Sequence, residues 1–124
     1  MKKILIAEDS SVIQNLIKRV LNESSNNYEF KTVKNGEALL SSVEKENYDL
    51  LLVDVNMPKV NGIECVKRVR VSEHENANIP ILAITGNADD LTEDEYKVLG
   101  FSGLIIKPIN FDQLVATVGS MMGE

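Results

Sequence analysis

Short apolar runs that do not alternate with polar residues restrict the fold of this chain more than any other feature. Four such runs cover residues 4–7, 50–53, 79–84 and 104–106. A strand with one wet face alternates apolar and polar residues, so a continuous apolar run indicates a strand buried on both faces. A fifth, weaker run over 28–33 alternates apolar and charged side chains, as an edge strand does.

Between these runs the apolar residues take the spacing of helices. Apolar stripes follow Gly36, Gly62 and Asn110, and a short helix is predicted over about 90–99, ending at Gly100. The first stripe consists of Val12, Ile13, Leu16, Ile17, Val20 and Leu21. N-cap pairs are predicted at Asn61 and Glu64, Thr92 and Glu95, and Asn110 and Gln113. Five alternations of strand and helix predict an α/β protein whose parallel sheet is covered on both faces.

Composition narrows the possible partners and compartments. A length of 124 residues fits one domain, so we expect a single domain over 1–124 with no output domain. A formal net charge of −6 argues against direct binding to nucleic acid or to anionic membranes. No run reaches the roughly 18 apolar residues of a membrane span, and the first run is too short for a signal peptide. We therefore expect a cytoplasmic protein.

Polar residues stand where four of the five predicted strands end. Glu8 and Asp9 follow the first, Asp54 the third, Thr85 the fourth and Lys107 the fifth. Each has a simple structural explanation alone, such as a helix cap, a strand residue or a surface lysine. Because parallel strands bring their carboxyl ends to one edge of the sheet, the conjunction instead predicts a functional site there.

Three carboxylates at one edge repel one another unless they take up protons or a cation. Oxygen ligands select a hard ion, and a small cluster that leaves room for water and a phosphate oxygen suits Mg²⁺. Lys107 at the same edge adds a positive charge that, together with Mg²⁺, can neutralise a transferring phosphoryl group. A carboxylate held against that group can act as a nucleophile, and we assign this role to Asp54.

The segments "ILIAEDS", "LLVDVNMPKVNG", "ILAITG" and "LIIKP" resemble, in order and spacing, the signature segments of response-regulator receiver domains of two-component signalling. The resemblance covers the whole chain. It implies a flavodoxin-like, doubly wound sheet of five parallel strands in the order 2-1-3-4-5 with five helices, as in the stand-alone chemotaxis receiver that exemplifies this order.

The resemblance also implies that Asp54 accepts a phosphoryl group from a phosphohistidine on a histidine kinase or a histidine phosphotransfer protein. Asp9 and Asp54 would bind Mg²⁺ through their carboxylates, Glu8 directly or through water, and Asn56 through its backbone carbonyl. Asn56 and Asn87 would lie near the path of the hydrolytic water. Such a protein catalyses its own phosphorylation and dephosphorylation, so we expect a signalling protein and not an enzyme.

Other positions follow the same resemblance. Thr85 would hydrogen-bond one phosphoryl oxygen, Lys107 would ion-pair with another, and Gly86 would keep the pocket open. The bond from Lys107 to Pro108 is expected to be cis, which only X-Pro bonds adopt at low cost. The fourth helix, fifth strand and fifth helix would form the face that binds a downstream protein, unless the phosphoryl group is passed onward. The chain would be a monomer or a phosphorylation-dependent dimer.

The sequence departs from the family pattern at two positions. Glu8 stands where aspartate is commoner, and its longer side chain should still reach the cation. Leu104 stands where the family usually has an aromatic residue, so the usual movement of a ring behind Thr85 does not carry over.

Two alternative functions remain. A pseudo-receiver would have the same fold and bind partners without phosphorylation. A haloacid-dehalogenase-type phosphatase would need a second aspartate at the position of Asn56, which cannot donate a carboxylic proton. A nucleotide-binding protein would need a glycine-rich phosphate loop, and the sequence contains neither GxGxxG nor GxxxxGK[ST].

Overall fold

The computed structural model describes residues 1–25, 27–86 and 91–123. Five parallel strands form one sheet in the order β2-β1-β3-β4-β5. The strands are β1 Lys2–Ala7, β2 Tyr28–Val33, β3 Leu50–Asp54, β4 Ile81–Thr85 and β5 Gly103–Ile106. The predicted fold class and strand order are confirmed.

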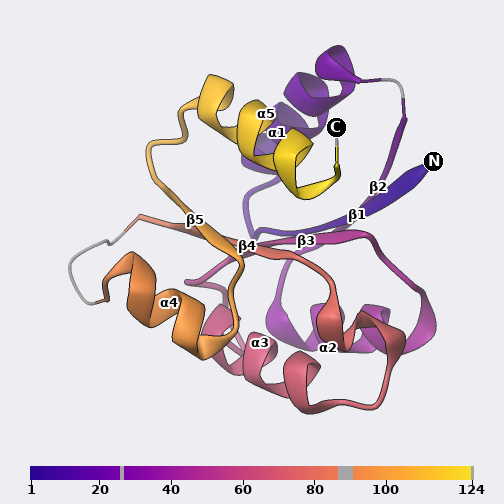
Figure 1. The fold of residues 1–124 in the computed structure, drawn as a ribbon, viewed down its shortest axis with the longest axis vertical. Coiled ribbons are helices and arrows are strands. Elements are labelled where there is room, and N and C mark those ends of the chain that lie inside the picture. The colour runs from indigo at the N-terminus through magenta and orange to yellow at the C-terminus, as the bar shows by residue number, and fades with distance from the viewer. Residues whose placement is uncertain (26, 87–90, 124) are drawn as a thin grey trace.

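Helices cover both faces of the sheet, as Figure 1 shows. They are α1 Ser11–Ser24, α2 Gly36–Lys45, α3 Gly62–Val71, α4 Glu93–Leu99 and α5 Phe111–Met121, with a short 3₁₀ helix, η1 Glu75–Asn78. One core lies between the sheet and α1 with α5, and the other between the sheet and α2, α3 and α4. Every residue of β3 and of β4 is buried, which is why these runs do not alternate.

The predicted helix ends are confirmed. The side chains of Asn61, Thr92 and Asn110 each accept a bond from the backbone N–H three residues on. In α4 the Thr92 N–H also donates to Glu95 at 2.9 Å, which completes a capping box. Gly100 ends the helix with a φ of +118°, a left-handed conformation that favours glycine.

Some predicted boundaries were wrong. The fourth strand begins at Ile81 and not at Ile79, because Ile79 is the C-cap of the 3₁₀ helix and Pro80 has no N–H for a ladder bond. The fourth helix begins at Glu93, whereas Asp90, its expected start, lies outside the described residues.

The prediction of the first apolar stripe was also partly wrong. Val12 is 68% exposed, and the residues that α1 buries are Gln14, Ile17 and Leu21.

In the part of the chain that the structure describes, none of the helices combines the length and the apolar character that a membrane crossing needs.

Candidate functional site

The predicted site residues meet at the carboxyl edge of the sheet. Glu8 follows β1 directly, Asp54 and Thr85 are the last residues of β3 and β4, and Lys107 follows β5. The order of the strands places β1 and β4 on either side of β3, and β5 beside β4. Asp54 therefore lies at the centre of this edge.

A glycine lets α3 approach the Asp54 end of β3 closely. A Cβ atom on Gly62 would lie 2.8 Å from the Asp54 carbonyl oxygen and 2.8 Å from the Val55 Cα. Real Cβ atoms do not approach backbone this closely, so a larger residue would push the helix away from the strand end. The Gly62 N–H donates to the Val55 carbonyl at 3.0 Å, which fixes the turn that follows Asp54.

Two buried carboxylates share one ammonium group at the centre of the site. Lys107 Nζ lies 3.2 Å from Glu8 Oε1 and 3.2 Å from Asp54 Oδ2. The other oxygen of each acid accepts a backbone N–H from two residues further along, Ser10 at 3.1 Å and Asn56 at 3.0 Å. Glu8 is 1% exposed and Asp54 is 2% exposed, so both carboxylates are held in a fixed orientation.

The remaining predicted ligands lie at the surface of this cluster. Asp9 is exposed, and carboxylate oxygens of Glu8, Asp9 and Asp54 all lie within 4.8 Å of one another. Asn56, whose backbone carbonyl was the fourth predicted ligand, is exposed beside Asp54. Asn87, predicted near the path of the hydrolytic water, lies outside the described residues.

The charges in this cluster do not balance. Three carboxylates face one lysine. Two carboxylates whose oxygens lie within 4.8 Å of each other repel by about 3 kcal/mol at an effective dielectric constant near 20. Burial, the neighbouring Asp9 and the charge of Asp54 raise the pKa of Glu8 to about 7, against the bonds from Ser10 and Lys107. Burial would lower the pKa of Lys107, but Asp54 and Glu8 outweigh it and raise this pKa.

This donor set fits a Mg²⁺ ion. All three side chains offer oxygen atoms, which a hard cation prefers, and the net charge of the cluster is negative. A divalent cation would stabilise the ionised carboxylate and so oppose the burial and the neighbouring acids that raise the pKa of Glu8. Glu8, Asp9 and Asp54 are the side chains that would hold it.

Thr85 is the last residue of β4, and Leu104 lies in the neighbouring strand β5. Thr85 is 1% exposed, and its carbonyl accepts the Lys107 N–H at 2.7 Å, so the end of β4 fixes the backbone of the lysine. The bond from Lys107 to Pro108 is cis, as predicted. Leu104 is half-buried and packs against the core that contains Tyr96 and Phe101.

Sequence reasoning missed one residue of this region. Gln14 is buried in α1, and its side-chain amide donates to the Glu8 carbonyl at 2.6 Å and the Val33 carbonyl at 3.0 Å. Its spacing from Ile17 and Leu21 was the available signal, because a polar residue on the buried stripe of a helix needs a partner.

Comparison with known proteins gives one consistent family. A family model described as the response regulator receiver domain matches residues 4–119. The CAI-1 autoinducer sensor kinase/phosphatase CqsS of Vibrio cholerae is 33% identical over 96% of the chain, which spans 17% of the length of CqsS. The polar-differentiation response regulator DivK of Brucella anthropi is 28% identical, with 99% of this chain and 98% of DivK covered.

Solved structures agree with these sequence relatives. The receiver domain of the sensor histidine kinase PA1611 from Pseudomonas aeruginosa superimposes with a TM-score of 0.86 at 26% identity. The match covers 99% of this chain and 98% of that domain, whose crystal structure has a magnesium ion coordinated in the active-site cleft.

Proposed function

The chain belongs to the family of response regulator receiver domains, and on that basis we propose that it accepts a phosphoryl group on Asp54 in a Mg²⁺-dependent reaction. The observation that carries the proposal is the pair of 3.2 Å contacts from Lys107 Nζ to Glu8 and Asp54. A pair built for stability alone would match one acid to one base. Here the carboxylates outnumber the lysine, and this excess of negative charge suits a site that binds a cation together with an anionic phosphoryl group.

In the proposed reaction, a carboxylate oxygen of Asp54 attacks the phosphorus atom of a phosphohistidine. A P–O bond forms, the P–N bond breaks, and its electron pair returns to the imidazole ring, which then takes up a proton. Bound Mg²⁺ would supply positive charge to the transferring phosphoryl oxygens.

The side chains of the site divide the remaining work. Asn56 N–H and Lys107 Nζ each hold one oxygen of Asp54, so the plane of the acceptor carboxylate is fixed before the donor arrives. We assign Lys107 to pair with a phosphoryl oxygen and Thr85 to hydrogen-bond another. Burial of Glu8 and Asp54 strengthens these charge interactions.

The donor and the output are part of the same proposal. Kinship with CqsS, described as a sensor kinase/phosphatase, supports a histidine kinase or a histidine phosphotransfer protein as the donor. We assign α4, β5 and α5 to the face that a downstream protein recognises. Leu104 in place of an aromatic residue means that this face responds without a ring moving behind Thr85. We class the chain as a phosphoacceptor signalling protein and not as an enzyme.

The test is the intact mass of the purified chain after incubation with acetyl phosphate or phosphoramidate, with Mg²⁺ or with a chelator. We expect a gain of one phosphoryl group only with Mg²⁺. Asp54→Asn should abolish the gain, and Asp112→Asn, at an exposed aspartate of α5, should not. An unchanged mass of the folded wild type with both donors would overturn the proposal in favour of a pseudo-receiver.

A further inference from the structure

Gln14 is a buried amide that bonds the backbone beside the acidic cluster. It is 5% exposed and shares the buried face of α1 with Ile17 and Leu21. Its Nε2 atom donates to two carbonyl oxygens, those of Glu8 at 2.6 Å and Val33 at 3.0 Å. A leucine would fill this core position without the cost of burying an amide, so the two bonds are what the glutamine provides.

These two carbonyls lie where the ladder between β1 and β2 ends. The Glu8 N–H donates at 3.0 Å to the carbonyl of Val33, and Val33 forms the last pair of the two strands with Ala7. The Gln14 amide then bridges the Val33 and Glu8 carbonyls. The Glu8 carbonyl belongs to the planar peptide unit that joins Glu8 to Asp9, so its direction sets the orientation of the backbone that carries both acids.

We propose that Gln14 is a positioning residue for the acidic cluster, which holds the Glu8–Asp9 peptide in the orientation that Mg²⁺ binding requires. The inference rests on the proposed function, because it concerns the same cation. Without the amide, the peptide plane is free to rotate and the Glu8 carbonyl loses its buried partner. Residues that orient metal ligands in this way change affinity by about 10–100-fold when they are replaced.

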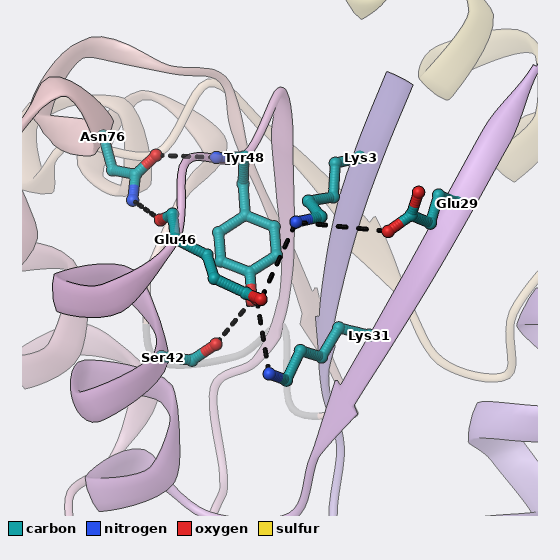
Figure 2. Close-up of polar contacts among 7 residues, drawn as sticks. All are labelled: Lys3, Glu29, Lys31, Ser42, Glu46, Tyr48 and Asn76. Carbon is teal, nitrogen blue, oxygen red and sulfur yellow. Dashed lines mark hydrogen bonds and ion pairs between the residues drawn. The ribbon is translucent and has the colours of Figure 1, made fainter. Parts of the chain in front are cut away.

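Asn76 provides a matched control at the other end of the sheet. It is 1% exposed, and its Nδ2 atom also donates to two backbone carbonyls, those of Val43 at 2.8 Å and Glu46 at 2.7 Å. Its Oδ1 atom accepts the N–H of Tyr48, just before β3, as Figure 2 shows. Asp54 ends the same strand at the opposite edge. The two amides thus each have a pair of carbonyl partners but lie at opposite ends of the sheet, and only Gln14 lies beside the acidic cluster.

The experiment compares Gln14→Met with Asn76→Leu, since each substitution removes the amide and keeps a side chain of similar size. Urea unfolding measures stability, and isothermal titration measures the affinity for Mg²⁺. We expect both variants to lose stability, but only Gln14→Met to bind Mg²⁺ about tenfold more weakly. At saturating Mg²⁺, its phosphorylation by acetyl phosphate should return toward the wild-type rate, because Asp54 and Lys107 are intact.

Gln14→Asn keeps the amide with a shorter reach, and it is the second variant if Gln14→Met does not fold. It should also bind Mg²⁺ more weakly than the wild type. Mg²⁺ affinity within twofold of the wild type in the folded Gln14 variant would overturn the inference and leave the proposed function standing. A wild type that neither binds Mg²⁺ nor becomes phosphorylated would overturn the proposed function itself.

Discussion

Two clusters of charged side chains, one toward each end of the sheet, shift the pKa of a glutamate in opposite directions. Toward the amino end, Glu46 accepts the Tyr48 hydroxyl at 2.7 Å and lies 3.3 Å from Lys31 and 3.7 Å from Lys3, as Figure 2 shows. The Tyr48 hydrogen bond and then Lys31 lower the pKa of Glu46. At the carboxyl end, burial and neighbouring acids raise the pKa of Glu8 to about 7.

The difference supports a structural role for the cluster around Glu46 and the proposed functional role for the cluster around Glu8. The Glu46 carboxylate finds enough positive charge and hydrogen bonds within the chain, so it needs no other group. Glu8 and Asp54 share a single ammonium group and face Asp9 as well. This shortage of positive charge in the folded protein supports the proposal that the site takes a cation and a phosphoryl group.

Removing the ammonium group from the carboxyl end should have the largest effect. Lys107→Met leaves Glu8 and Asp54 in place but takes away the charge that, in the proposed reaction, faces the transferring phosphoryl group. We expect phosphorylation by acetyl phosphate to slow by about a hundredfold to a thousandfold. The rate is measured by intact mass over time at saturating Mg²⁺.

Lys3→Met is the control for this substitution, because it removes a lysine from the Glu46 cluster. Its phosphorylation rate should stay within about twofold of the wild type, since Lys3 lies far from the strand ends that form the site. Equal losses of rate in both variants would mean that lysines act only through the overall charge.

Removing the Asn76 amide tests how much the hydrogen bonds at the amino end of the sheet stabilise the fold. Asn76→Leu leaves the Val43 and Glu46 carbonyls and the Tyr48 N–H without their partner. We expect the free energy of unfolding to fall by about 3 kcal/mol, measured by urea denaturation. A loss below about 0.5 kcal/mol would show that water or a shift of the backbone replaces these bonds.

The sequence predicted the strand ends well because the physical signal is local. A non-alternating apolar run indicates a strand buried on both faces, and the polar residue after it marks the sheet edge. This is how Glu8, Asp54, Thr85 and Lys107 were placed together from the sequence alone. Pro80 shifted the start of β4, although the run itself continued through it.

The two buried amides were not predicted because their partners are remote or lie on the backbone. Asn76 bonds Tyr48, which is 28 residues away, and the 3₁₀ helix that carries it has no apolar period. Gln14 was not recognised because the apolar stripe of this helix was assigned to include Val12, which is exposed in the structure, whereas Gln14 is buried. Periodicity identifies the face of a helix, but it does not show which polar residue bonds a carbonyl beneath it.

The raised pKa of Glu8 predicts a pH-dependent affinity for Mg²⁺. Only the ionised carboxylate binds the cation well, so affinity should fall about tenfold from pH 8 to pH 6. Without metal, the raised pKa of Glu8 means that its carboxyl group stabilises the folded state fully below the ordinary pKa of 4.5. This contribution to the free energy of unfolding is lost as the pH rises through about 7. Isothermal titration at several pH values measures the change in affinity.

Glu8→Gln should flatten this pH dependence, because the amide does not titrate. Glu64→Gln, at an exposed glutamate of α3, is the matched control and should keep it. The same slope in Glu8→Gln as in the wild type would assign the pH dependence to another group.

The smallest effect is expected from the Tyr48 hydroxyl. Tyr48→Phe keeps the buried ring, over which Lys3 Nζ lies at 5.8 Å, but removes the bonds to Ser42 and Glu46. We expect a loss of about 1 kcal/mol in the free energy of unfolding at pH 7, measured in urea. Because Glu46 has a lowered pKa, its stabilising contribution is present above pH 4.5 and is lost as the pH falls, so the difference between variant and wild type should shrink in acid. Phosphorylation of Asp54 should not change, and a slower reaction in this variant would show that the two ends of the sheet are coupled.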